Sequence, residues 1–171
     1  RLKMGMVFQG AALFDSMNIY DNVGFALKRI KRMPENQVRE KVDELLEWVG
    51  LKGAGDRYPA EMSGGMRKRA GIARAIAMEP ELVLFDEPTT GLDPIMTDVI
   101  DNLINKLKKE KNMTSVVVTH DMKSAYKTGD YIYMMEQGTM MGQGTPDKIR
   151  TSEDPRIRQF IEGRAEGPIR V

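Results

Sequence analysis

Apolar residues recur at helical spacing in two stretches of the first half of the chain. The first stretch begins at Gln37 and ends at Gly50, where a helix C-cap belongs. Its apolar residues are Val38, Val42, Leu45, Leu46 and Val49. The second stretch follows Ser63-Gly64-Gly65, is rich in Ala and Arg through Ala77, and has Pro80 just beyond its end. The pattern predicts one helix over each stretch.

The period of the pattern then changes. Residues 82–85 (Leu-Val-Leu-Phe) and 115–119 (Ser-Val-Val-Val-Thr) are short runs typical of strands buried on both faces of a parallel sheet. Between them helical spacing returns, at Met96, Val99, Ile100, Leu103, Ile104 and Leu107. The order strand, helix, strand predicts an α/β fold with both strands in one parallel sheet.

The rest of the pattern predicts shorter elements. Residues 4–8 are typical of a strand, residues 131–144 of an antiparallel hairpin that turns at Gln137-Gly138, and residues 157–161 of a last helix. Residues 9–22 are typical of a loop that carries exposed apolar side chains, at Leu13, Phe14, Ile19 and Tyr20. Such residues either form an interface or pack within a helical region next to the loop.

Charge and composition narrow the class of protein. The 26 Lys and Arg residues nearly cancel the 25 Asp and Glu residues, so the net charge argues against a nucleic-acid partner. No apolar run approaches the length of about 20 residues that spans a bilayer. The sequence contains no cysteine, which excludes disulfides and thiolate metal sites. We therefore expect a soluble protein of the cytosol.

Two acids, Asp86 and Glu87, follow the apolar run at 82–85 directly. In open α/β sheets, ligands bind at the carboxyl ends of the strands. Phosphoryl transfer from a nucleotide needs a carboxylate for Mg²⁺ and a second group that orients the attacking water. Asp86 suits the first role and Glu87 the second. The alternative is an acidic pair that only solvates a strand end.

Four further features are candidates for the same site. Ser63-Gly64-Gly65 at the start of a helix offers backbone N–H groups to an anion, although an ordinary Ser N-cap explains it as well. His120, the only histidine, follows the strand at 115–119, and Asp93 lies in a tight turn after Glu87. Gln9 follows the first strand and could reach a metal or a water molecule with its amide.

The ordered set Gln9, Ser63-Gly64-Gly65, Asp86-Glu87, Asp93 and His120 resembles the Q-loop, signature motif, Walker B motif, D-loop and H-loop of the ABC ATPase family. The resemblance implies a P-loop NTPase-like parallel-sheet core with a helical subdomain. It also implies four segments: residues 1–9 with a core strand and the Q-loop, 10–80 as helical subdomain, 81–150 as half of the catalytic core, and 151–171 as C-terminal helix and tail.

The resemblance implies a role for each of these residues. Asp86 and Gln9 would support Mg²⁺, Glu87 would polarise the water, and His120 would hold the γ-phosphate of ATP. Gln9 would also sense that phosphate and couple it to a membrane partner. Ser63, Gly64 and Gly65 would contact ATP held by a second copy of the subunit, and Asp93 would bridge the two copies.

Two departures from the family pattern stand out. Met66 takes the place of the Gln that usually ends the signature, which we expect to change detail only. The larger departure is that no G-x-x-x-x-G-K-[ST] motif occurs in the sequence. Together with the start at Arg1-Leu2-Lys3, this leads us to expect that the chain is N-terminally truncated and inactive by itself.

Within the family, Met66, residues 8–14 and residues 154–163 resemble the ATPases of Mce-type lipid transporters, the Mla or toluene-tolerance group. This implies a peripheral protein on the cytoplasmic face of a bacterial inner membrane. Its partners would be a membrane permease subunit and further lipid-transport components. The alternatives are an ABC head that acts on DNA, against which the lack of a heptad repeat argues, and a catalytically silent interaction module.

Overall fold

The computed structural model describes residues 3–169, and the chain divides into two units between Thr119 and His120. Arg1, Leu2, Arg170 and Val171, the outer ends of the first and last predicted segments, lie outside the described residues. Within the described part of the chain, no helix has both the length and the apolar composition for a membrane span. The finer division of the chain into four segments stays a prediction.

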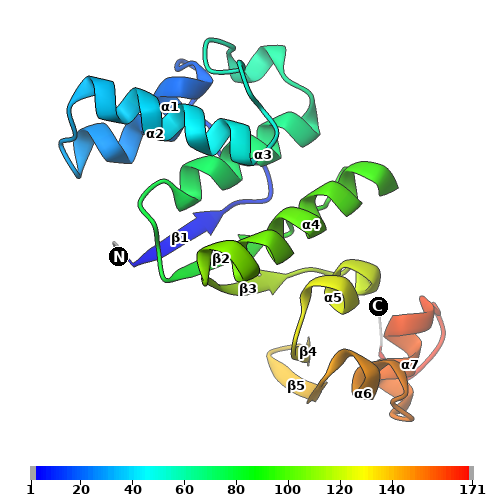
Figure 1. Ribbon diagram of the computed structural model, residues 1–171. Coiled ribbons are helices and arrows are strands. Elements are labelled where there is room, and N and C mark those ends of the chain that lie inside the picture. The colour runs from blue at the N-terminus through cyan, green and yellow to red at the C-terminus, as the bar shows by residue number, and fades with distance from the viewer. Residues whose placement is uncertain (1–2, 170–171) are drawn as a thin grey trace. The chain divides into compact units, whose positions relative to one another are not determined.

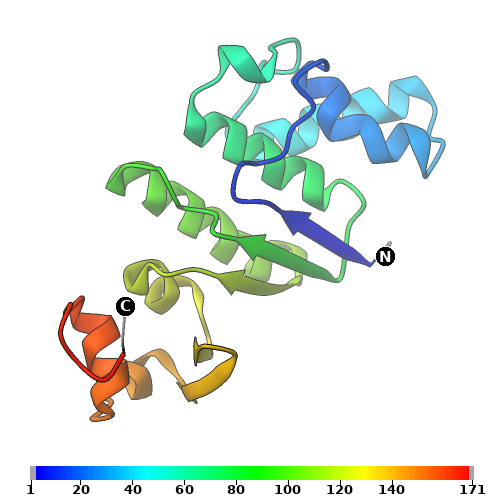
Figure 2. The same ribbon diagram turned by 180° about the vertical axis from the view of Figure 1, so that it is seen from behind.

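The first unit is built on a parallel sheet with the strand order β1-β2-β3 (Figures 1 and 2). The strands are β1 (Met4–Val7), β2 (Leu82–Asp86) and β3 (Thr114–Val118). Leu82 is paired with Met4 on one side and with Thr114 on the other. The predicted α/β fold, with the strands at 82–85 and 115–119 side by side, is therefore confirmed.

Helices cover one face of this sheet. α3 (Gly64–Ile76) packs on β1 and α4 (Pro94–Lys111) packs on β3, and both helices lie behind the strands in Figure 2. Val83 and Phe85 of β2 point to this side and are buried. On the opposite face Met6, Val116 and Val118 are 41–58% exposed. The prediction that β3 is buried on both faces is therefore wrong, because among the described residues of the first unit helices pack on one face of the sheet only.

Three helical elements lie between β1 and α3. They are α1 (Ile19–Arg29), α2 (Glu35–Trp48) and a 3₁₀ turn, η1 (Pro59–Glu61). The helix predicted between Gln37 and Gly50 is confirmed as α2, and Gly50 has the positive φ of 72° expected of a C-cap position. The segment between β1 and α3 is therefore mainly helical, and the assignment of residues 10–80 to one helical subdomain stays a prediction.

The prediction of a loop from residue 9 to residue 22 is wrong at its end. Asn18 caps α1 by accepting a hydrogen bond from the backbone N–H of Asp21 at 2.8 Å, so the helix begins at Ile19. Ile19 and Tyr20 are the first two helical residues and are buried, so for these two the alternative holds, packing within a helical region rather than exposure in a loop. Val23 and Leu27 continue the same buried face at helical spacing.

The second unit contains α5 (Met122–Thr128), β4 (Ile132–Glu136), β5 (Thr139–Gly144), α6 (Pro146–Arg150) and α7 (Pro155–Glu162). β4 and β5 form the predicted antiparallel hairpin. Gln137 and Gly138 both have positive φ, which is the conformation of a two-residue hairpin turn whose twist matches the strands. Met134, Ile149 and Ile157 form the core of this unit.

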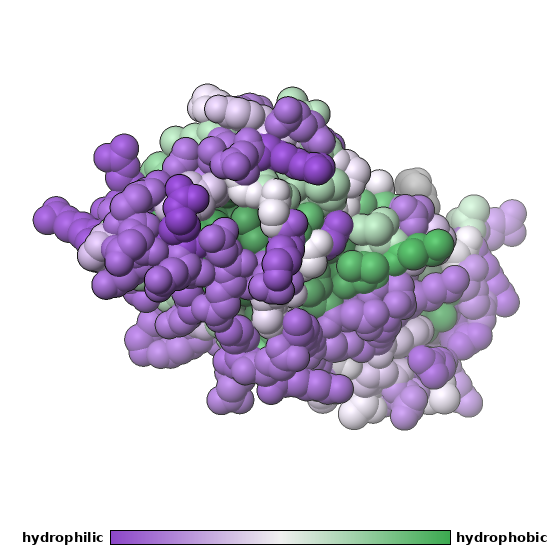
Figure 3. Space-filling model, turned by 45° about the horizontal axis from the view of Figure 1, so that its top comes forward, coloured by the Kyte–Doolittle hydropathy of each residue, from purple (hydrophilic) through white to green (hydrophobic). Residues whose placement is uncertain are grey.

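Hydrophobic residues also reach the surface. In the space-filling view they gather in the middle of the displayed face, bordered by hydrophilic residues (Figure 3). Exposed large apolar side chains of the first unit include Met4, Met6, Phe14, Ile95, Val116 and Val118. Patches of this kind mark surfaces on which other elements or partners bind.

Candidate functional site

Asp86 and Glu87 lie at the carboxyl end of β2, as the sequence predicts, and both are half-buried. The backbone N–H of Glu87 donates to the carbonyl of Val118 at the end of β3, at 2.9 Å. Glu87 has a φ of 46°, in the left-handed region that a non-glycine residue seldom adopts. Such a conformation persists only where the surrounding structure holds it, and it is frequent at functional sites.

The turn after Glu87 fixes the direction of its carboxylate. The hydroxyl of Thr90 donates to Oε2 of Glu87 at 2.8 Å, and the backbone N–H of Thr90 donates to the carbonyl of Glu87 at 3.3 Å. Gly91 follows with a φ of 77°, which bends the chain toward α4. Glu87 is therefore held by its backbone and by its side chain, in a place where a reactant could approach the sheet edge.

Asp93 is the N-cap of α4. Its Oδ1 accepts from the N–H of Ile95 at 2.9 Å and from that of Met96 at 3.0 Å, and Pro94 occupies the first helical position. The residue is exposed. The structure thus assigns a capping role to Asp93, and the bridging role between two subunits stays a prediction.

Ser63-Gly64-Gly65 opens α3. Ser63 caps the helix by accepting from the N–H of Met66 at 3.3 Å, so the N-cap interpretation is confirmed. A Cβ on Gly65 would lie 2.5 Å from the Cε of Met96, which shows that α3 and α4 pack closely here. Because Ser63 is exposed, the start of α3 is open to an anion, and ATP binding at this point stays a prediction.

The loop that follows β1 is held against α3. Gln9 is exposed in this loop, and Ala11 and Ala12 have positive φ. The guanidinium of Arg74 donates to the carbonyls of Ala12 at 2.7 Å and of Ala11 at 2.9 Å, and burial lowers the pKa of Arg74. The Gln9 loop is thereby joined to the helix that begins with Ser63-Gly64-Gly65.

Asn22 fixes the far end of the same loop. Its side chain is fully buried, accepts from the backbone N–H of Phe14 at 2.7 Å and donates to the carbonyls of Phe14, Met17 and Asn18. Phe14 is 44% exposed, and the centroid of its ring lies 5.2 Å from that of the Phe25 ring. Next to it is an open pocket of about 300 Å³ lined by Met17, Asp21, Phe25, Lys28 and Arg29.

The last two features of the candidate site are His120 and the residues that would hold a metal. His120 is exposed at the start of the second unit, and its role beside Glu87 stays a prediction. In the described residues no group of three or more acidic, histidine or cysteine side chains could hold a metal by itself. Mg²⁺ in nucleotide sites is bound by one or two carboxylates together with substrate phosphates. Asp86, a half-buried carboxylate at the sheet edge, fits this use.

Two residues of this site were missed by sequence reasoning. Thr90 was given no role, and its hydrogen bond to Glu87 is the kind of contact that composition does not reveal. Lys68 is buried with its ammonium group beside the same turn. A signal for Lys68 was present, because Lys68, Ile72 and Ile76 are spaced by four residues and so lie on one face of α3.

A family model described as ABC transporter matches residues 1–90, which is more than half of the chain. The chain belongs to this family of ATP-binding cassettes, as the order of its motifs predicts. It is 44% identical over 170 residues to the intermembrane phospholipid transport system ATP-binding protein MlaF of Haemophilus influenzae. The match covers 99% of this chain and 64% of that protein, so the chain spans less than two thirds of this relative's length.

Two solved structures share the fold. The dimeric post-hydrolysis state of the ATP-binding cassette MJ0796 with ADP and Pi has a TM-score of 0.75 and 32% identity, over 84% of this chain and 63% of that one. The structure of cbiO1 from Clostridium perfringens, part of the ABC transporter complex cbiONQ, has a TM-score of 0.80 and 32% identity, over 95% and 68%. The P-loop NTPase-like fold class is therefore confirmed.

Proposed function

We propose that this chain is part of an ATP-binding subunit that hydrolyses ATP to drive transport by a membrane complex. The observation that carries the proposal is the position of Glu87, held at the carboxyl end of β2 by Val118 and Thr90. A carboxylate fixed there is suited to accept a proton from an attacking water. Asp86, one residue earlier on the strand, supports Mg²⁺, which neutralises charge on the transferred phosphate when it is bound.

The other candidate residues act around the same phosphates. His120 holds the γ-phosphate, and Gln9 senses it and reaches the metal or its water. Ser63 and the N–H groups of Gly64 and Gly65 contact ATP held by a second copy of the subunit, because a helix N-terminus far along the chain from Asp86 is more readily offered to a neighbour. Support comes from the related cassette that was solved as a dimer with ADP and Pi.

A membrane permease subunit is the second partner that we propose. Phe14, Phe25 and the pocket beside them form a partly apolar recess on α1 that suits a short cytoplasmic helix. Leu13 is half-buried next to it, whereas Ile19 and Tyr20 are buried in the helical region and are not offered to a partner. The subunit then lies on the cytoplasmic face of a bacterial inner membrane and, like the MlaF relative, serves transport of phospholipid or a related apolar molecule.

The proposal is tested by titrating ATP and Mg²⁺ into this 171-residue chain and into the complete gene product. The chain has no G-x-x-x-x-G-K-[ST] cradle for the β- and γ-phosphates, so we expect neither binding nor turnover from the chain alone. The complete protein should bind ATP in the calorimeter and release phosphate. ATP hydrolysis by the chain alone at the rate of the complete protein would contradict this account. So would a complete protein that neither binds nor hydrolyses ATP.

The partner surface is tested separately with Phe14→Asp in the complete protein. A carboxylate in the recess next to Phe25 should abolish copurification with the membrane subunit while the isolated subunit keeps its melting temperature. Phe160→Asp is the matched control, because Phe160 is similarly exposed (40%) but lies in α7 of the second unit. Equal copurification of both variants with the permease would remove Phe14 from the interface.

A further inference from the structure

Lys68 is a charged residue inside the first unit that none of the expected motifs uses. It lies on α3, five residues after Ser63, and is only 8% exposed. Its Nζ donates to the carbonyl of Thr90 at 2.7 Å and to that of Glu87 at 3.3 Å. Burial lowers the pKa of Lys68, and the charge of Glu87 opposes that effect. An ammonium group is costly to bury unless it is paired, so both contacts matter for its position.

The two carbonyls belong to the first and last residues of the turn that holds the candidate base. Glu87 keeps its left-handed backbone because its N–H is bonded to Val118 and its carbonyl accepts from Lys68 and from the N–H of Thr90. Thr90 in turn donates its hydroxyl to the carboxylate of Glu87. A shift of the Thr90 carbonyl therefore moves the hydroxyl that orients Glu87.

We propose that Lys68 is a positioning residue that holds the Glu87–Thr90 turn in the geometry for hydrolysis and ties this turn to the start of α3. The inference rests on the proposed function. Ser63 and Lys68 lie on one rigid helix, about 7 Å apart along its axis. In the proposed dimer, Ser63 contacts the ATP of the partner while Lys68 holds the base that acts on the subunit's own ATP. Lys68 thus links the two ATP sites within one subunit.

The test uses Lys68→Met in the complete gene product, which keeps the length of the side chain and removes its donors. We expect kcat for ATP to fall at least about tenfold with KM within about twofold, because a base displaced by about 1 Å loses up to about a hundredfold in rate. Lys68→Arg, which keeps the charge and the N–H donors in a different geometry, should retain more of kcat than Lys68→Met does. Wild-type kcat in Lys68→Met, or an Arg variant as slow as the Met variant, would overturn the proposal.

Arg69→Met is the matched control. Arg69 is the next residue of α3, is half-buried and also donates to two carbonyls, those of Gly50 at 2.9 Å and Val49 at 3.4 Å. These belong to the end of α2 and not to the turn. The control should lose stability without the specific loss of kcat. An equal loss of kcat in both variants would show that Lys68 acts only through general stability.

Two further measurements separate positioning from structure. Amide hydrogen exchange without nucleotide should speed up over residues 87–92 in Lys68→Met and stay unchanged there in Arg69→Met. In a Glu87→Gln background, Lys68→Met should lower the residual rate less than about twofold, because both changes act through one group. Unchanged exchange, or an undiminished loss of rate in that background, would overturn the proposal.

Failure of this inference can be told apart from failure of the proposed function. If Glu87→Gln is slow but Lys68→Met hydrolyses ATP normally, only the role of Lys68 is lost. If Glu87→Gln hydrolyses ATP at the wild-type rate, both the proposed function and the role of Lys68 are lost. If Lys68→Met does not fold, Lys68→Gln, which keeps one polar donor of shorter reach, carries the same expectation of low kcat and faster exchange.

Discussion

Asn22 is the buried polar residue that joins the Gln9 loop to α1. Its side chain satisfies both the N–H and the carbonyl of Phe14 and reaches two further carbonyls, in a position that is fully buried. When one partner of a buried hydrogen bond is removed, the other group stays buried without a partner. The free energy that this costs is larger than the net stabilisation that the bond itself contributes. The shape of this loop therefore depends on one side chain.

We predict that Asn22→Ala lowers the free energy of unfolding by about 2–4 kcal/mol, because at least two backbone groups of Phe14 lose their partner. Urea denaturation measures the change. Asn18→Ala is the control, since Asn18 makes a single capping bond to Asp21 and should cost only about 1 kcal/mol. Asn22→Asp should not restore stability, because a carboxylate cannot donate to the carbonyls. Equal stability of the two alanine variants would contradict this role of Asn22.

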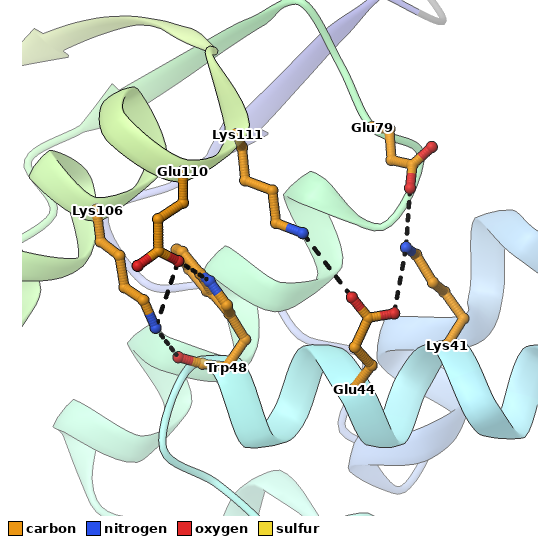
Figure 4. A network of polar contacts seen from close by, with 7 residues as sticks. All are labelled: Lys41, Glu44, Trp48, Glu79, Lys106, Glu110 and Lys111. Atoms are coloured by element: carbon orange, nitrogen blue, oxygen red, sulfur yellow. Dashed lines mark hydrogen bonds and ion pairs between the residues drawn. The ribbon is translucent and has the colours of Figure 1, made fainter.

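At the scale of elements, α2 is tied to α4 and to the turn before β2 by the polar network in Figure 4. Lys41 of α2 bonds Glu79 at 2.8 Å, and Trp48 at the end of α2 donates to Glu110 of α4 at 2.8 Å. The ammonium of Lys106 lies 4.4 Å above the Trp48 ring. These contacts join the helical region to the sheet, although exposed ion pairs contribute little each.

The Lys41–Glu79 pair predicts a dependence of stability on pH. The hydrogen bond from Lys41 holds the pKa of Glu79 below its ordinary value of 4.5, and the same bond raises the pKa of Lys41. A lowered carboxyl pKa stabilises the folded state above the unfolded value, and this contribution is lost as the pH falls through the folded pKa. Glu79 is more than half exposed, so the contribution is small.

We therefore predict that Glu79→Gln lowers the free energy of unfolding by less than about 1 kcal/mol at pH 7, and that this difference shrinks as the pH falls below 4.5 and through the folded pKa of Glu79. Urea denaturation of both proteins across this range is the measurement. Glu40→Gln, which removes an exposed carboxylate next to Lys41 in α2, should differ less from wild type at pH 7. A difference for Glu79→Gln that persists unchanged in acid would exclude the ion pair as its cause.

Elements with a clean period could be predicted from the sequence, and elements that depend on distant contacts could not. α2, α3, β2 and the hairpin turn at Gln137-Gly138 were all predicted, because local spacing and capping residues specify them. α1 was not predicted as an element, and its first residues were assigned to a loop because the Gly, Asp and Ser residues before Asn18 are typical of one. The exposure of β3 could not be predicted, because it depends on which elements cover the sheet.

The residues of the candidate site also divide into those that a local pattern predicts and those that depend on distant contacts. Asp86 and Glu87 were placed at the end of a strand by an apolar run followed by two acids, which is a local signal. The contacts of Lys68 with Glu87 and Thr90 span 19 and 22 residues of sequence, and a lysine is expected at the surface by default. Local pattern thus located the carboxylates, whereas only the folded chain showed what holds them.

At the scale of the whole molecule, the residues proposed for hydrolysis come from distant parts of the sequence. Gln9 follows β1, Asp86 and Glu87 end β2, and Ser63 begins the helix that packs beside them. The parallel order β1-β2-β3 brings the carboxyl ends of the three strands to the same edge of the sheet. We propose that Glu87 accepts the proton of the attacking water at this edge.

The most direct test is steady-state phosphate release by the complete gene product carrying Glu87→Gln. The amide keeps the size of the side chain but cannot accept a proton, so we expect ATP binding to be retained and hydrolysis to fall at least about a hundredfold. Glu81→Gln, an exposed carboxylate just before β2, should leave the rate unchanged. Phosphate release by Glu87→Gln at the wild-type rate would contradict the account.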